Sequence, residues 1–99
     1  MNAIQTIEAA VERVGSQRRL AELIGTAEQN ISGYKKGRPI SYQKLAEIAA
    51  IAGLEEEARR ILLQGMADAL REDLPHEAEA KNGLLAILKA FPKVASSKS

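Results

Sequence analysis

The side chains best suited to recognise another molecule are concentrated between Leu20 and Pro39. This stretch reads LAELIGTAEQNISGYKKGRP and contains two amides, Gln29 and Asn30, followed by three cations. The cations are Lys35, Lys36 and Arg38. A glutamine or asparagine amide can form two hydrogen bonds with the edge of an adenine, and lysine and arginine neutralise phosphates. These residue types therefore indicate contact with a polyanion, and duplex DNA is the polyanion that suits both groups.

The distribution of charge along the chain agrees with this interpretation. The formal net charge of the whole chain is only +1. Residues 13–44 nevertheless contain seven Lys and Arg against two Glu, whereas residues 55–79 contain eight Asp and Glu against three Arg. A basic half suits a polyanion, and an acidic half indicates a different task. Ordinary solvated charge is the alternative explanation.

Composition limits the chemistry that the chain can perform. Its 99 residues, 45% of them hydrophobic, are enough for one small domain. The chain has no cysteine, which excludes disulfides, thiolate zinc sites and a cysteine nucleophile. The single histidine, His76, has no second histidine or cysteine with which to build a metal site. We therefore expect no metal and no cofactor.

Neither enzymatic chemistry nor membrane insertion is expected. Ser16, Ser32 and Ser41 have no histidine partner in the pattern, and each lies where a helix cap or an exposed helix face is expected. The apolar run LLAIL at residues 84–88 is far too short to span a bilayer. The first residues carry acids and no basic head, so we expect no signal peptide and a cytoplasmic location.

Hydrophobic spacing predicts an all-α bundle of five to six helices. Gly15 is expected to end the first helix, and Ser16 to cap the start of the second. Gly25 should end the second helix. Thr26, with Gln29 three residues later, predicts a capping box at the start of the third.

The helical pattern continues through the second half of the chain. Ser41 predicts the start of a fourth helix, and the acidic triplet at residues 55–57 suits the start of a fifth. Gly65 lies inside the fifth helix, where it costs about 1 kcal/mol relative to alanine. Pro75 predicts the first turn of a last segment, which we expect KNG at residues 81–83 to interrupt.

The second and third helices, joined through Gly25, predict a helix-turn-helix. Glycine tolerates the positive φ that such a turn requires, and Ala21 is small enough for the two helices to cross closely. In this arrangement the second helix of the pair lies in the DNA major groove, with its first residues on base edges. The predicted core of the motif is Leu20, Ala21, Ile24, Gly25, Ile31 and Tyr34.

The segment QRRLAELIGTAEQNISGYKKGRP closely resembles the helix-turn-helix of Cro and the lambdoid phage repressors. The matching positions are Gln17, Leu20, Ala21, Ile24, Gly25, Thr26, Gln29, Ile31 and Gly37. The following ISYQKLAEIAAIAGL resembles the family's fourth helix, so the resemblance covers roughly residues 4–54. It implies a lambda-repressor-like fold and a transcriptional regulator of phage, prophage or bacterial type. Such a regulator, most often a repressor, would bind a palindromic operator in double-stranded DNA as a homodimer.

The resemblance also implies which residues contact DNA. The base-contacting set is Ala27, Glu28, Gln29, Ser32 and Gly33, and the phosphate-contacting set is Gln17, Lys35, Lys36 and Arg38. The chemistry of most of these side chains suits those roles. Two positions depart from the pattern. Gly33 has no side chain with which to read a base, and Glu28 brings a negative charge that could serve only the helix start.

Residues beyond the resemblance are expected to form a second functional unit. We divide the chain into a DNA-binding domain (1–54), a C-terminal helical extension (55–92) and a flexible tail (93–99). A lone helix-turn-helix covers few base pairs, so we expect the extension to form a homodimer. The expected interface residues are Ile61, Leu62, Met66, Leu84, Ile87, Leu88 and Phe91. The alternatives are a last helix that caps its own chain, and the segment LLAILKAFPK lying on a membrane surface.

A second function from another class stays open. The chain could be a protein-interaction module, antitoxin-like or regulator-binding, that reuses the helix-turn-helix scaffold. Its acidic half would then bind a regulatory protein partner, and Gly33 and Glu28 favour this alternative. Salt-dependent binding to duplex DNA separates the two functions, because phosphate neutralisation weakens steeply as salt rises.

Overall fold

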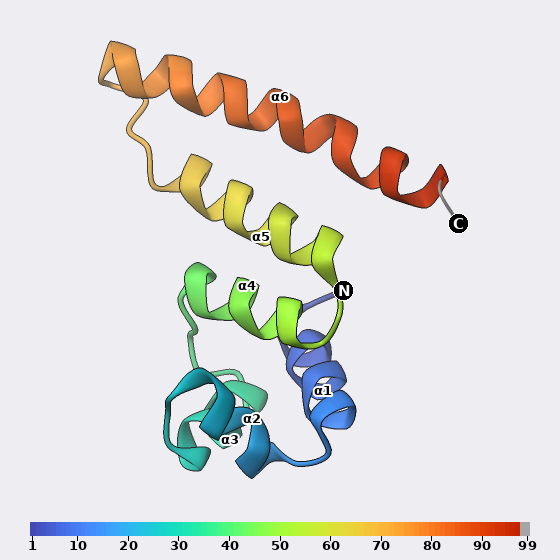
Figure 1. Cartoon of the computed structure of the whole chain (residues 1–99). Helices are drawn as coiled ribbons and strands as arrows, with labels where there is room; N and C mark the ends of the chain where they lie inside the picture. The colour runs from blue at the N-terminus through green and yellow to red at the C-terminus, as the bar shows by residue number, and fades with distance from the viewer. Residues whose placement is uncertain (98–99) are drawn as a thin grey trace.

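The structure is a computed structural model that describes the backbone of residues 1–97 and the side chains of residues 1–89. This part of the chain contains six α-helices and no strand, which confirms the all-α prediction. They are α1 (Ala3–Val14), α2 (Gln17–Ile24), α3 (Glu28–Lys35), α4 (Tyr42–Ile51), α5 (Glu55–Asp68) and α6 (Pro75–Ser97). Figure 1 shows α1, α2 and α3 grouped at one end, with α4, α5 and α6 stacked in order toward the other.

Local sequence sets most of the helix ends. Gly15 and Gly25 end α1 and α2 in the left-handed region, with φ of 105° and 69°, where glycine has no Cβ penalty. Ser16 caps α2 by accepting a hydrogen bond from the backbone N–H of Arg19 at 3.0 Å. Ser41 caps α4 in the same way through Lys44, at 3.2 Å. These four boundaries agree with the sequence prediction.

The predicted capping box at Thr26 and Gln29 is wrong. Helix α3 begins at Glu28, and the residue before it, Ala27, has no side chain that could cap it. The Thr26 hydroxyl instead accepts a hydrogen bond from Nδ2 of Asn30 at 2.7 Å. The N-cap position therefore falls one residue after Thr26, whose hydroxyl bonds to a side chain one turn along the helix.

The predicted interruption at residues 81–83 is also wrong. Helix α6 runs unbroken from Pro75 to Ser97 and therefore passes the predicted tail boundary at residue 93. An ion pair between Lys81 and Glu72, at 3.2 Å, ties this stretch to the segment before the helix. A single glycine such as Gly83 costs only about 1 kcal/mol in a helix. Residues 98 and 99 of the predicted tail lie outside the described residues.

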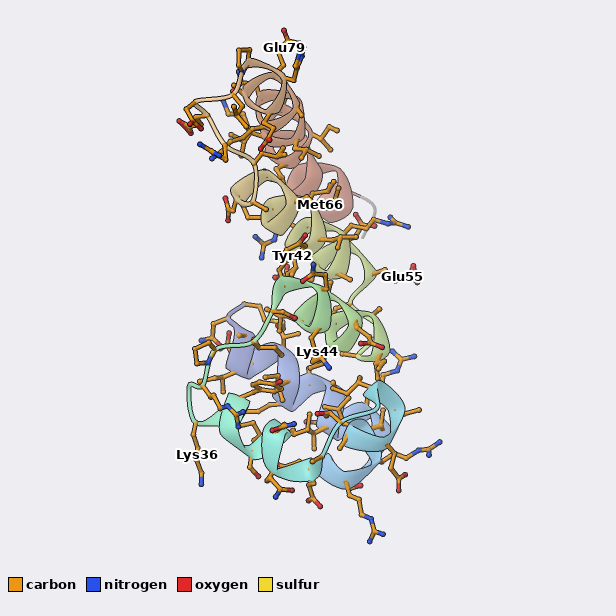
Figure 2. All side chains as sticks on the ribbon, turned by 90° about the vertical axis from the view of Figure 1, so that its left-hand side faces the viewer. Lys36, Tyr42, Lys44, Glu55, Met66 and Glu79 are labelled. Atoms are coloured by element: carbon orange, nitrogen blue, oxygen red, sulfur yellow. The ribbon has the colours of Figure 1, made fainter. Side chains whose placement is uncertain are left out.

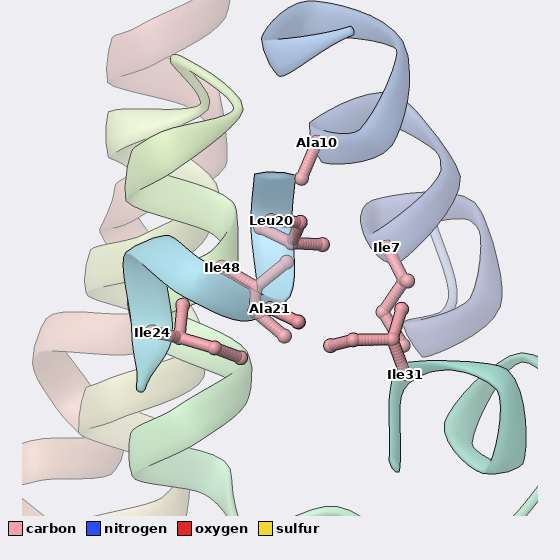
Figure 3. Packing of buried hydrophobic residues seen from close by; sticks show 7 residues of the cluster. All are labelled: Ile7, Ala10, Leu20, Ala21, Ile24, Ile31 and Ile48. Atoms are coloured by element: carbon pink, nitrogen blue, oxygen red, sulfur yellow. The ribbon is translucent and has the colours of Figure 1, made fainter. Parts of the chain in front are cut away.

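A compact aliphatic core holds the first four helices together. Its buried members are Ile7, Ala10, Leu20, Ala21, Ile24, Ile31 and Ile48. Figure 3 shows these side chains converging from α1, α2, α3 and α4. Complete burial of each large aliphatic side chain contributes about 1.5–3 kcal/mol. Because every member comes from α1 to α4, the positions of α2 and α3 are set without help from α6.

Helices α5 and α6 form added layers outside this core. Helix α5 packs against α4, and α6 packs against α5 and against no other helix in the described part of the chain. Leu84 and Leu88 of α6 are half-buried in this way. The division at residue 54 stays a prediction, although the layering places the boundary helix α5 outside the main core. No helix in the described part combines the length and the apolar character needed to cross a membrane.

Gly65 allows α5 to approach the start of α4. A β-carbon at Gly65 would lie 2.1 Å from Cγ of Tyr42 and 2.6 Å from its Cβ. Those atoms lie close to the backbone of α4, so they cannot swing away as the end of a long side chain would. The helix-propensity cost of Gly65 is therefore offset by the packing of α5 on Tyr42.

We expect Gly65→Ala to destabilise the protein by about 1 kcal/mol or more, because overpacking exceeds the gain in helix propensity. Gly83→Ala is the matched control, since a β-carbon at this α6 position meets nothing within 4 Å. The control should be neutral or stabilising. Chemical denaturation of both variants measures the difference. In a Tyr42→Gly background, which removes the Cβ of Tyr42 as well as its ring, Gly65→Ala should become stabilising, and destabilisation that persists there would show that Tyr42 is not the obstacle.

Candidate nucleic-acid interface

The outer surface of α3 is presented by the way α2 and α3 are joined. Residues 25–27 connect the two helices, and the Thr26 N–H donates to the carbonyl oxygen of Ala21 at 2.9 Å. Ile31 is completely buried and fixes the inner side of α3 against the core. Glu28 and Gln29, on the side away from the core, are exposed. The exposed surface of α3 is therefore held rigidly by a buried one.

One group of donors lies where the start of α2 meets the end of α3. Nε2 of Gln17 donates to Oγ of Ser32 at 2.6 Å, and Oε1 of Gln17 accepts from Nζ of Lys35 at 3.4 Å. Together with Lys36, these side chains line an open hollow of about 250 Å³. An amide, a hydroxyl and two ammonium groups around one hollow favour an anion. We refer to Gln17, Ser32, Lys35 and Lys36 as the α2–α3 hollow.

A second group of polar side chains lies across α3 from this hollow. Nδ2 of Asn30 donates to Oγ1 of Thr26 at 2.7 Å, and Oδ1 of Asn30 accepts from Nη1 of Arg38 at 3.4 Å. Asn30 and Ser32 are two residues apart on the helix, so their side chains point to nearly opposite sides. Arg38 therefore returns from the loop after α3 to the side of the helix that the hollow does not occupy.

The structure divides the residues that the resemblance assigned to DNA. Of the base-contacting set, Ala27, Glu28 and Gln29 are exposed at the start of α3, and Ser32 is turned toward Gln17 in the hollow. Gly33 is half-buried beneath the side chain of Arg38. Of the phosphate-contacting set, Gln17, Lys35 and Lys36 lie together in the hollow, whereas Arg38 does not.

The sequence analysis did not predict the hydrogen bonds that join Thr26, Asn30 and Arg38. The spacing of four residues between Thr26 and Asn30 was the available signal, because side chains at positions i and i+4 meet on one helix face. The amide orientation follows from chemistry, since Arg38 can only donate and must therefore meet the oxygen of Asn30. The three side chains together form a connected network on the surface of α3.

The cations near α3 differ from those in the second half of the chain. In the described part, no ion pair joins Lys35, Lys36 or Arg38 to a carboxylate. The basic residues of α5 and of the segments around it are paired: Arg59 with Glu56, Arg60 with Glu57, Arg71 with Asp73 and Lys81 with Glu72. The Glu57 carboxylate, which accepts hydrogen bonds from Arg60, raises the pKa of that guanidinium.

The cations next to α3 also lie far from the acid-rich second half of the chain. Figure 2 shows Lys36 and Glu79 at opposite ends of the molecule. The three cations next to α3 thus lie at the end of the molecule that carries α2 and α3. Like charges that lie close together repel unless an anion joins them, so this end of the protein suits an anionic partner.

Comparisons of this chain with models of known protein families, with curated proteins and with solved structures found no match.

Proposed function

We propose that the protein is a sequence-specific, double-stranded DNA-binding transcriptional regulator, of the Cro and lambdoid repressor type that its sequence resembles. Helix α3 would enter the major groove as the second helix of a helix-turn-helix. The observation that carries the proposal is the group of Lys35, Lys36 and Arg38, which have no carboxylate partner among the described residues and flank a helix whose inner side is buried. Its cytoplasmic location and its action as a repressor belong to the same proposal.

The α2–α3 hollow suits one phosphate of the DNA backbone. Gln17 is oriented there by Ser32 and Lys35, so its position does not depend on the ligand. The start of α2 adds the partial positive charge of a helix N-terminus. A phosphate held at this point would fix the angle at which α3 meets the groove. Gln29, exposed on the first turn of α3, is then placed to pair with the N6 and N7 atoms of adenine.

We also propose that the protein acts as a homodimer through α5 and α6. Leu84 and Leu88 are half-buried, and the packing of α6 on α5 accounts for this. Leu62, Met66 and Ile87 stay 41%, 43% and 47% exposed, which leaves an apolar surface on these two helices. Ile61 is half-buried, and the side chain of Phe91 lies outside the described residues. A dimer contacted through the exposed residues would present two copies of α3 to a palindromic operator.

The same apolar surface supports the second candidate, an antitoxin-like or regulator-binding module. A regulatory protein rather than a second copy would then cover Leu62, Met66 and Ile87. Glu28, which forms no ion pair in the described part, would also suit a protein partner better than a phosphate. DNA binding and its salt dependence distinguish this candidate from the regulator.

We expect the protein to bind arbitrary duplex DNA with an affinity that falls steeply as salt rises. Lys35→Ala and Lys36→Ala should each weaken binding to all duplexes alike and reduce the slope of log K against log salt by about one unit. Fluorescence anisotropy with labelled duplexes measures both quantities. Arg59→Ala is the control, because Arg59 lies on α5 and is paired with Glu56 at 2.9 Å. Absence of salt-dependent binding by the wild-type protein would favour the protein-interaction module.

Selection from a random duplex pool should yield a palindromic site with half-sites about one DNA turn apart. Gln29→Ala should weaken binding to that site by about 1–3 kcal/mol and leave binding to random DNA almost unchanged. Gln64→Ala, on α5 and away from α3, is the control. Equal losses on selected and random DNA would mean that Gln29 supports the fold and reads no base.

Introducing charge at the apolar surface should separate the two copies. Met66→Glu together with Ile87→Glu alters exposed positions, so the monomer should stay folded. We expect the wild-type protein to sediment as a dimer and the variant as a monomer, with a larger loss of affinity for the palindrome than for random DNA. Truncation after Leu74, which removes α6, should likewise reduce dimerisation and lower the affinity for the palindrome more than the affinity for random DNA. A monomeric wild-type protein would mean that α6 only caps its own chain, and a dimeric variant would place the interface elsewhere.

A further inference from the structure

The side chain of Arg38 occupies the space above Gly33. A β-carbon at Gly33 would lie 3.0 Å from Cδ of Arg38 and 3.2 Å from its Nη1. Arg38 follows α3 in sequence, but Gly33 makes room for it to return over the helix. Its backbone N–H also donates to the carbonyl oxygen of Gly33 at 3.0 Å, which fixes the start of the side chain beside the same residue. The absent side chain at position 33 is thus replaced by one from the loop.

Asn30 directs the guanidinium of Arg38. Its Oδ1 accepts from Nη1 at 3.4 Å, while its Nδ2 is held by Thr26 at 2.7 Å. A guanidinium has five N–H donors in a planar fork, and one bond to Asn30 leaves most of that fork free. Arg38 is also exposed and has no carboxylate partner in the described part of the chain. A fixed and solvated guanidinium therefore lies on α3 beside Gln29, on the side away from the α2–α3 hollow.

We propose that Arg38 determines sequence specificity by donating two hydrogen bonds to O6 and N7 of a guanine in each half-site. This inference rests on the proposed function, and it gives Arg38 a different role from the phosphate contact that the resemblance implied. Arginine with guanine is the pairing that a bidentate fork makes in the major groove. Lys35 and Lys36 remain phosphate ligands. Gly33 is then required because it makes room for Arg38, and Asn30 is a positioning residue.

The test uses selection from a random duplex pool, with salt titrations, on the full-length protein and three variants. Arg38→Lys keeps the charge and removes the fork. Gly33→Leu keeps Arg38 but fills the space over the helix with an apolar side chain that cannot bond to a base edge. Lys36→Ala is the matched control, because it removes a charge from the same segment without touching Gly33. Thermal unfolding of each variant confirms that it is folded.

We expect the wild-type protein to select a guanine at one position of each half-site. Arg38→Lys and Gly33→Leu should both reduce the preference for that guanine by about tenfold or more, with the salt slope unchanged. Lys36→Ala should reduce the slope by about one unit and keep the guanine preference. An unchanged guanine preference in both Arg38→Lys and Gly33→Leu would overturn the role of Arg38 and leave DNA binding intact. A wild-type protein that selects no sequence would instead overturn the proposed function itself.

Discussion

The burial of Ile31 is the constraint on which the candidate interface depends. This side chain is completely buried in the core cluster, and α3 packs on α1 and α2. An α-helix of eight residues has little stability of its own, so α3 exists because its inner side is covered. Fixing that inner side also fixes the outer one. Gln29 and Asn30, the two residues before Ile31, therefore cannot turn toward the core. The polar surface of α3 is presented in one orientation.

Charge is arranged to match this orientation. Cations next to α3 have no carboxylate partner in the described part of the chain, while those around α5 pair with acids a few residues away. Exposed ion pairs contribute little to stability, typically below about 1 kcal/mol. The difference between the two halves therefore has little effect on folding. Its effect is on how charge is distributed, because Lys35, Lys36 and Arg38 add unpaired positive charge next to α3.

The second half of the chain adds surface rather than core. In the part of the chain that the structure describes, α6 packs on α5 and on no other helix, so one side of its apolar stripe is covered there. Leu84 and Leu88 are partly buried there, and Ile87, on the same stripe, is not. The packing on α5 accounts for Leu84 and Leu88, and the dimer contact through the exposed Ile87 stays a proposal. The two roles are compatible, because a helix has more than one side.

The sequence by itself determined the all-α fold, the ends of most helices and four core residues, Leu20, Ala21, Ile24 and Ile31, because caps and apolar spacing act over one or two helical turns. Thr26 shows where this fails, since the N-cap of α3 is Ala27 and the Thr26 hydroxyl bonds to the side chain of Asn30. Only the tertiary structure shows which neighbours favour glycine at positions 65 and 33. Gly65 faces Tyr42 from another helix, and Gly33 lies beneath Arg38 from the following loop. Such contacts depend on where the backbone places side chains from other segments, and a local pattern of residue types does not predict those positions.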